Sequence, residues 1–444
     1  MDRRLLKFLP FALVLLLPVG SRAAIDPKSG RDLLAPEILR SMQNYMLEKR
    51  FDGWLFTGQG RFDDIDSEFL GLKGETRHRW FIFYPAMATL KKPFLIYHAD
   101  DERVFDGLSL FPVTYRSRRE MKEAIKAKIF SVAHEIGVNY SPGLQVPEIS
   151  RIDAGTVELL QEIGIKVLSS GSLLSFYHTR WTVQDVETHK SAAARLDSLL
   201  PLAIEYLKEK LSHGKKITDL ELADYVLKSL KKLGLEPAGP VTLALGANTL
   251  KESYEPDRKN RQAIGRDTLV YLEVSARQKG NAEAMFARLG WTLYTGAAVP
   301  EGLANSWARI AAAADTALAV LESRLAGGGS LQGWEVDRAS RSALSGDPNS
   351  LPRPFGYNLN RRGLRFGVRF DDYLAHDDRE VMPGLGFTLE PGIYLPEYAL
   401  RLCADLFIEA DRSVTLTSPL QRRIIAVLGP AGQLVEAFAP PVEN

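Results

Sequence analysis

The segment Phe-Thr-Leu-Glu-Pro-Gly-Ile-Tyr at residues 387–394 decides how this chain is interpreted. Alternating apolar residues up to Leu389 predict a buried strand. Pro391 and Gly392 predict a turn directly after it, because proline fixes φ and glycine permits a positive φ. Glu390 is therefore expected at the end of a buried strand. Such a carboxylate is either an ordinary strand-end residue or part of a functional site, and this segment alone leaves both possibilities open.

Length and composition describe a globular protein with two domains. The chain has 444 residues, of which 45% are hydrophobic and 25% are charged, and this is too long for one ordinary core. The formal net charge is +1, but without residues 1–24 there are 52 basic and 54 acidic residues, a net charge of −2. This balance argues against nucleic acid or an anionic membrane surface as the main partner.

Residues 1–24 have the pattern of an export signal peptide. A basic start precedes an apolar stretch at 8–19, and the small residues Ser21 and Ala23 form a cleavage site. The apolar stretch is too short to span a bilayer. We therefore expect a periplasmic or extracellular protein with no stable membrane span after cleavage, and an uncleaved N-terminal anchor is the alternative. Cys403 is the only cysteine, which excludes an internal disulfide.

The chain after the signal alternates between helical and strand-like patterns. We place a first α/β domain at residues 25–178 and a second domain at 179–444, because the pattern resets near 177–185. In the first domain, helices are predicted at 38–50, 120–130 and 154–163, and strands at 54–56, 80–84, 93–97 and 137–140. In the second, helices are predicted at 186–211, 220–233, 303–325 and 334–344, a hairpin at 267–277 and 282–295, and strands at 240–245, 361–370, 386–394 and 400–409.

This order of elements resembles the creatinase, prolidase and aminopeptidase P group of the pita-bread metallopeptidase superfamily over residues 38–420. The resemblance rests on the Glu-Pro-Gly-Ile-Tyr segment at 390–394 and the long helix that opens after 182–185. It also rests on a set of residues at matching places, namely Pro383, Gly384, Gly280, Gly363, Gly367 and Arg401. It implies an α/β (α+β) chain with an N-terminal creatinase-like domain and a C-terminal pita-bread domain. It also implies a homodimer.

The resemblance further implies a centre for two divalent metal ions held by five residues. Two of the five matching positions carry a carboxylate, Glu273 and Glu390. The other three are occupied by Ala284, Leu364 and Cys403. Alanine and leucine offer no donor atom, and a thiolate suits hard, oxygen-preferring ions poorly. We therefore expect that the metal centre is lost and that the protein needs no cofactor.

Histidines expected from the family are also replaced. The two substrate-side positions match Ser253 and Asp371, neither of which can shuttle a proton near neutral pH as imidazole does. A one-residue shift would bring Glu283 into the place of Ala284, but in an extended hairpin this side chain would face the opposite side. His376 lies in a polar loop and is expected to be solvated.

Two further residues allow alternative interpretations. Cys403 is either a thiolate nucleophile or soft metal ligand, or a small apolar filler, and we favour the filler. Arg401 could form a bidentate contact with Glu390 or Glu273 and replace part of the lost metal charge. Two carboxylates that face each other without a cation would otherwise repel, and one of them would bind a proton.

The sequence therefore predicts an exported pseudoenzyme whose pocket binds a peptide or a small molecule, with cationic ligands favoured. The candidate pocket residues are Glu273, Ser253, Asp371, Glu390, Arg401 and Cys403. Two alternatives remain open. One is a metal-independent C–N hydrolase of the creatinase kind, and the other is an active Xaa-Pro aminopeptidase with displaced ligands.

Overall fold

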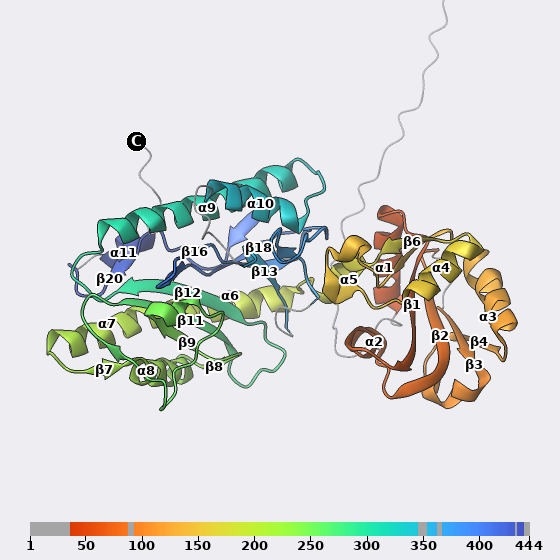
Figure 1. Ribbon diagram of the computed structural model, residues 1–444, viewed down its shortest axis with the longest axis horizontal. Helices are drawn as coiled ribbons and strands as arrows, with labels where there is room; N and C mark the ends of the chain where they lie inside the picture. Colours follow the sequence, from red (N-terminus) through yellow and green to blue (C-terminus); the bar gives the residue numbers. More distant parts are fainter. Residues whose placement is uncertain (1–35, 88–92, 345–352, 362–365, 431–432, 439–444) are drawn as a thin grey trace, which may run out of the picture.

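The computed structural model describes residues 36–87, 93–344, 353–361, 366–430 and 433–438. The predicted signal peptide and Leu364 lie outside these ranges. Within them, no helix is both long enough and apolar enough to cross a membrane. The chain is a mixed α/β protein with an N-terminal sheet region and a C-terminal pita-bread region (Figure 1).

The N-terminal region is built on a six-stranded sheet with the order β4-β3-β2-β1-β5-β6. Its central strands are continuous apolar runs because both faces are covered. Phe81 and Phe83 pack into a core on one face, while Trp80 and Ile82 pack into another on the opposite face. The elements are α1 (Pro36–Glu48), β1 (Gly53–Arg61), α2 (Asp64–Leu70), β2 (Glu75–Pro85), β3 (Phe94–His98), β4 (Phe111–Tyr115), α3 (Arg118–Ile125), β5 (Glu135–Val138), α4 (Ala154–Ile163), β6 (Lys166–Ser169) and α5 (Gly171–His178).

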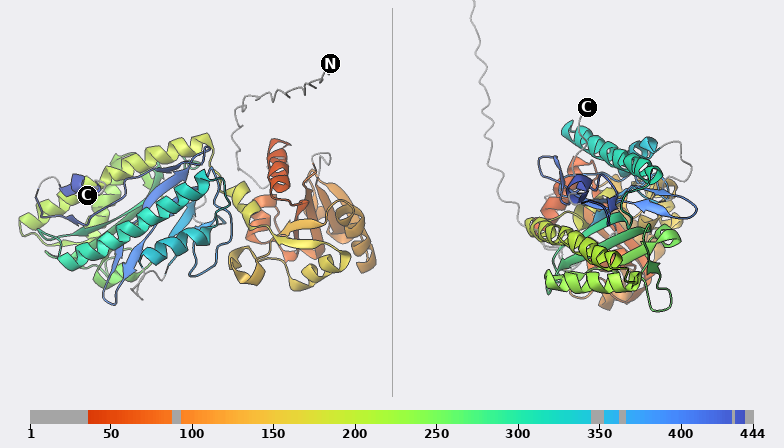
Figure 2. Two further views of the ribbon diagram at one scale, coloured as in Figure 1. Left: turned by 90° about the horizontal axis from the view of Figure 1, so that it is seen from above. Right: turned by 90° about the vertical axis from the view of Figure 1, so that its left-hand side faces the viewer.

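The C-terminal region places its sheets between two groups of helices. In Figures 1 and 2, α9 and α10 lie on one side and α7 and α8 on the other. The helices are α6 (Val183–Asp197), α7 (Leu199–Ser212), α8 (Asp219–Lys232), α9 (Glu301–Ala326), α10 (Gly333–Ala343) and α11 (Gln433–Phe438). A sheet with the order β20-β12-β11-β8, to which β9 is added along β11, faces a second sheet with the order β14-β13-β15-β18-β19.

The strands of this region are short. They are β7 (Ile217–Thr218), β8 (Leu235–Pro237), β9 (Thr242–Leu245), β10 (Ala263–Ile264), β11 (Leu269–Gln278), β12 (Ala287–Tyr294), β13 (Gly356–Leu359), β14 (Arg369–Phe370), β15 (Gly386–Leu389), β16 (Gly392–Tyr394), β17 (Ala399–Arg401), β18 (Ala404–Ile408), β19 (Val414–Leu416) and β20 (Ile425–Ala426). The pair β16–β17 and the pair β10–β7 form two small additional sheets.

Several predicted elements differ from the structure, and the strands predicted at 386–394 and 400–409 are each divided into two. The single helix predicted at 186–211 is two helices, α6 and α7, which meet at Ser198. Pro201 explains the break, because it lacks an N–H group and its ring excludes the carbonyl group four residues earlier. The strand predicted at 361–370 is wrong in position, because pairing occurs upstream in β13 and only at the end of the predicted range in β14.

Another difference concerns the Glu-Pro-Gly turn. Gly392 does not have a positive φ, whereas Gly384 does, at 87°. Glycine is required at 392 for space instead, since a Cβ atom there would lie 2.9 Å from the carbonyl oxygen of Leu400. The chain breaks between β15 and β16 at Glu390 and Pro391, and between β17 and β18 at Leu402 and Cys403.

Candidate functional site

Strand register brings the residues of the candidate site together. Glu273 of β11 lies opposite Gly290 of β12, and Ser275 lies opposite Arg288. Because side chains alternate along a strand, Arg288 shares the face of Gly290 and hence of Glu273. Gly290 also pairs with Cys403 through two backbone hydrogen bonds, of 2.9 and 3.3 Å. This bridge brings the segment between β17 and β18 against the hairpin.

The side chain of Arg288 lies between the carboxylates of Glu273 and Glu390. Its Nε and Nη2 donate hydrogen bonds to Glu273 Oε1 at 3.1 and 2.9 Å. Its Nη1 lies 3.3 Å from Glu390 Oε1, an ion pair without hydrogen-bond alignment. The side chains of Arg288, Glu273 and Glu390 are only 12%, 9% and 11% exposed. One guanidinium group therefore compensates two nearly buried negative charges.

A second arginine completes the neutralisation of Glu273. Arg401 Nη2 lies 3.2 Å from Glu273 Oε2, and the hydroxyl group of Tyr271 donates to the same oxygen at 2.5 Å. The Arg401 guanidinium also stacks over the Tyr271 ring, 4.3 Å from its centroid, and donates to the carbonyl oxygens of Lys251 and Glu252. Both carboxylate oxygens of Glu273 thus have fixed donors.

These contacts set the protonation states at the site. Burial alone would raise the pKa of Glu273, but the charges of Arg288 and Arg401 outweigh it and hold this pKa below its usual value. Burial, together with the charge of Glu390, raises the pKa of Cys403 well above that of a free thiol. Cys403 is therefore a buried thiol, and it donates a weak hydrogen bond to the carbonyl oxygen of Arg288 at 3.4 Å.

Asp405 of β18 is a buried acid that the sequence did not indicate. Its Oδ2 accepts the backbone N–H of Arg288 at 2.7 Å, and its Oδ1 has no hydrogen-bond partner among the described residues. Burial raises the pKa of Asp405 well above its usual value. Burial therefore favours the uncharged form of this side chain.

A cleft of 610 Å³ opens beside this cluster. Glu273, Arg288 and Ser253 line it, and its remaining lining residues are Pro237, Ala238, Gly239, Pro240, Thr242, Glu252, Ser275, Arg277, Phe286 and Arg361. The predicted pocket residue Ser253 therefore lies at the same cavity as Glu273. Glu252, also on the lining, is the other acid that faces this space.

Two predicted positions lie elsewhere. Ala284 is buried in the turn between β11 and β12, where its N–H donates to Asn281. Asp371 is buried and accepts the backbone N–H groups of Tyr373 and Leu374 at 3.0 and 2.9 Å. It stabilises its own loop and is not one of the cleft-lining residues, and neither are the predicted pocket residues Glu390, Arg401 and Cys403.

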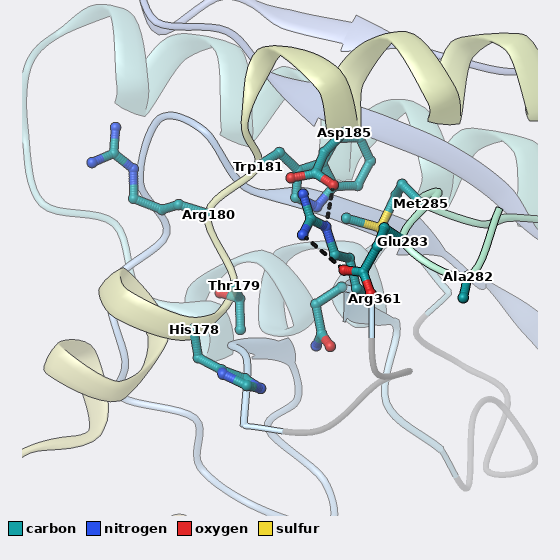
Figure 3. A pocket seen from close by; sticks show the side chains of 10 residues that line it. His178, Thr179, Arg180, Trp181, Asp185, Ala282, Glu283, Met285 and Arg361 are labelled. Carbon is teal, nitrogen blue, oxygen red and sulfur yellow. Dashed lines mark hydrogen bonds and ion pairs between the residues drawn. The ribbon is translucent and has the colours of Figure 1, made fainter. Parts of the chain in front are cut away.

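The two residues weighed as substitute ligands also stay apart from the cluster. Glu283 points into a neighbouring pocket of 130 Å³, where its carboxylate lies 3.4 Å from Arg361, which also pairs with Asp185 at 2.6 Å (Figure 3). His376 stacks on Trp334 and bonds Asp372 at 2.7 Å. Neither one contributes a ligand atom to the group around Glu273 and Glu390.

Arg288 is the principal residue that sequence reasoning missed. The signal was present in the hairpin register, because the residue two positions before Gly290 must face the same side as Glu273. Gly290 itself is required by close packing, since a Cβ atom there would lie 2.5 Å from the Tyr271 hydroxyl group and 2.9 Å from Cys403 Cβ.

Comparison with known proteins agrees with this architecture. Residues 187–415 match the model of metallopeptidase family M24. The chain belongs to this family. The match to M24 begins in α6 and ends in β19, so it includes Glu273, Arg288, Glu390 and Arg401. No curated protein sequence matches the chain.

Solved structures of M24-like fold resemble the whole chain at low sequence identity. The dipeptidase PepE from Mycobacterium ulcerans is 14% identical, covers 89% of this chain and 98% of its own, and has a TM-score of 0.57. The prolidase from Pyrococcus horikoshii is 15% identical, with coverages of 87% and 99% and a TM-score of 0.50. The N-terminal domain of the FACT complex subunit SPT16 from Cicer arietinum is 12% identical, with coverages of 89% and 97% and a TM-score of 0.51. These likenesses concern the fold.

Proposed function

We propose that this M24 protein binds a peptide or small molecule in its cleft without the dinuclear metal chemistry of a peptidase. The observation that carries the proposal is the Arg288 guanidinium between Glu273 and Glu390. A fixed cation there occupies the space and supplies the positive charge that metal ions would provide. The fold by itself does not decide whether the chain cleaves peptides, because similar folds are found in a dipeptidase, in a prolidase and in a FACT complex subunit.

The donor atoms at this site do not suit two divalent ions. Glu273, Glu390 and Cys403 each offer one ligand atom within 4.8 Å of the others. Both oxygens of Glu273 are already bound by guanidinium or hydroxyl donors, and Cys403 carries a proton. Hard divalent ions need several free anionic oxygens. Adding such ions to a cluster that is already neutral would leave their charge uncompensated.

The cleft itself is well formed for a polar ligand. Its volume of 610 Å³ is within the range of ordinary ligand sites. Its walls combine hydroxyl groups of Ser253 and Ser275 with the charged side chains of Glu252 and Arg288 and the ring of Phe286. Because Glu273 is already paired with arginines, the cationic ligand favoured by sequence loses its main counterion. A ligand with both donors and acceptors, such as a short peptide, fits this lining better.

Metal binding and peptide cleavage test the proposal together. The purified chain is titrated with Mn²⁺, Co²⁺ and Zn²⁺, alongside a Glu390→Gln variant, so that metal binding at the group of Glu273, Glu390 and Cys403 is what the variant loses. We expect Glu390→Gln to bind each metal as the unchanged chain does. We also expect no cleavage of Xaa-Pro peptides with any of the three ions. Metal binding that requires Glu390 and is accompanied by Xaa-Pro cleavage would overturn the proposal. Chelator-resistant C–N cleavage that disappears in Glu390→Gln would support a metal-independent hydrolase instead.

Export and self-association extend the same proposal. The basic and apolar pattern of residues 1–24 supports export with cleavage after this segment. The family resemblance supports a homodimer. N-terminal sequencing of the secreted protein and its mass in solution by light scattering test these two points, and an intact N-terminus or a monomeric mass would contradict them respectively.

A further inference from the structure

A second cavity lies apart from the cleft, between α9 and the segment that leads into α11 (Figure 1). It is lined by residues within 298–315 and within 422–437, and we call it the α9 groove. Its volume is 560 Å³, which is within the range of ordinary ligand sites. None of the described residues that line it also lines the cleft.

Alanine side chains leave the α9 groove open. The lining residues on α9 include Ala304, Ala308 and Ala312, which recur every four residues and therefore share one face of the helix. All three are exposed. On most helices such a face carries larger apolar side chains that pack against a neighbouring element. A stripe of small residues does not by itself indicate a ligand, so a second observation is needed.

A tryptophan of the same lining supplies that observation. Trp307 is 1% exposed, so its indole ring is removed from water. Its Nε1 has no hydrogen-bond partner among the described residues. An indole N–H group can only donate, and buried polar groups nearly always have a partner. An oxygen atom of a ligand in the groove would supply the acceptor that the described residues do not.

The opposite wall carries balanced charges. The backbone N–H groups of Arg422 and Arg423 both donate to the carbonyl oxygen of Ala437, at 2.6 and 3.2 Å, and hold α11 against this segment. Arg422 forms an ion pair with Asp315 of α9, and Arg423 lies 4.0 Å from Glu436. Each cation of the lining thus faces one anion. Charge complementarity therefore favours an uncharged ligand.

The size of the groove favours a small molecule over a protein segment. Its residues on α9 run from Ala304 to Asp315, about 16 Å along the helix axis. The helix on the other side, α11, has only six residues, or about 9 Å. A stable protein interface buries roughly 800 Å² on each partner. Walls of this length offer less than that.

We propose that the α9 groove binds an uncharged small molecule that has an apolar body and one carbonyl oxygen. The methyl groups of Ala304, Ala308 and Ala312 contact the apolar body, and Trp307 Nε1 donates a hydrogen bond to the oxygen. The inference does not depend on the proposed function of the cleft, because no described residue lines both cavities.

Benzophenone and diphenylmethane test this site, because both have two phenyl rings and only benzophenone has a carbonyl oxygen. Equilibrium dialysis against the full chain measures the affinity of each compound. We expect one benzophenone per chain, bound about fivefold more tightly than diphenylmethane, which is the gain from one net hydrogen bond. Trp307→Phe keeps an aromatic ring without the N–H group, so it should bind the two compounds equally.

A filled groove and a matched control locate the binding. Ala308→Trp fills the groove from an exposed position and should bind neither compound. Ala326→Trp makes the same change at an exposed alanine at the end of α9, outside the lining of the groove. This control should bind both compounds as the unchanged chain does.

Three results would overturn the inference. The first is that the unchanged chain binds neither compound. The second is binding that Ala308→Trp leaves unchanged, which would place the compounds elsewhere. The third is equal affinity for the two compounds in the unchanged chain, or a preference for benzophenone that persists in Trp307→Phe.

Other occupants of the groove would give their own results, and each would overturn the inference. If the unchanged chain binds no benzophenone and Ala308→Trp lowers its mass in light scattering, a second copy covers the groove. If benzophenone binds only after Val442→Asp, residues 439–444 of the same chain occupy it.

Discussion

Replacing Arg288 by alanine would leave Glu273 and Glu390 without the guanidinium that lies between them. The three side chains are 9–12% exposed, so water would compensate little of the exposed charge. Removing one partner from a buried ion pair costs about 3–5 kcal/mol. Arg401 still contacts Glu273 in this variant, which places the expected loss towards the lower end of the range and leaves Glu390 as the uncompensated group.

The pH dependence of this loss separates charge from packing. In the unchanged chain the lowered pKa of Glu273 stabilises the fold above its unfolded pKa of about 4.3. That contribution disappears as the pH falls through the lower pKa that Glu273 has in the folded state. In Arg288→Ala a carboxylate pKa rises above the unfolded value, so the variant loses stability as the pH increases through it. The difference in unfolding free energy between the unchanged chain and Arg288→Ala should therefore be large at pH 8 and small near pH 4.

Calorimetric unfolding at pH 8 and pH 4 measures this difference, and Arg277→Ala is the matched control. Arg277 lies in the same hairpin and pairs with Glu236 at 3.0 Å, but both side chains are about a third exposed. Its loss should cost no more than about 1 kcal/mol. Adding Mn²⁺ should stabilise Arg288→Ala and leave the unchanged chain as it was, because only the variant leaves Glu390 without its guanidinium partner. A loss below about 1 kcal/mol at pH 8, or equal stabilisation of both proteins by Mn²⁺, would refute the reasoning.

Three further predictions concern buried groups near the site. Burial lowers the pKa of His189 to about 4. The free energy of unfolding should therefore fall by about 3 kcal/mol as the pH falls from 6.5 to 4, because the unfolded chain binds a proton that the folded chain does not. Urea unfolding of His189→Gln should lack this loss. Asp405→Asn should change the unfolding free energy by less than about 1 kcal/mol, because burial raises the pKa of this acid and favours its uncharged form, which an amide resembles. A loss above about 2 kcal/mol in calorimetry would show that Asp405 is charged. Gly386→Ala should cost about 1–3 kcal/mol or more, because its Cβ atom would lie 1.9 Å from the Trp181 ring; an unchanged melting temperature would contradict this packing.

The fold could be predicted from the sequence because its signals are local. Continuous apolar runs such as residues 80–84 predict strands covered on both faces, and the helix predicted at 154–163 agrees with α4 residue by residue. The break at Ser198 was also readable, since Pro201 cannot continue a preceding helix. The position of β13 could not be predicted, because it depends on pairing with β15 rather than on the composition of β13 itself.

The chemistry of the site was less accessible, because it depends on which residues converge. Arg401 was expected to contact Glu273 or Glu390, and it contacts Glu273. The position eleven residues after Glu273 was expected to be a ligand position, but Ala284 lies in the turn and β12 begins only at Ala287. The first inward-facing side chain on that strand is therefore Arg288. A search limited to acids and histidines could not detect that an arginine lies between Glu273 and Glu390.

The two arginines explain how the fold accommodates two nearly buried carboxylates. Two buried carboxylates need positive charge close by, whether it comes from an ion or from a side chain. Arg288 and Arg401 provide it from within the chain, with hydrogen bonds to both oxygens of Glu273. Because a guanidinium group is always charged and its donors are directional, the chain itself supplies this positive charge. The same contacts fix Glu273 in place, so a carboxylate that identifies the family is held by its neighbours as a structural anion.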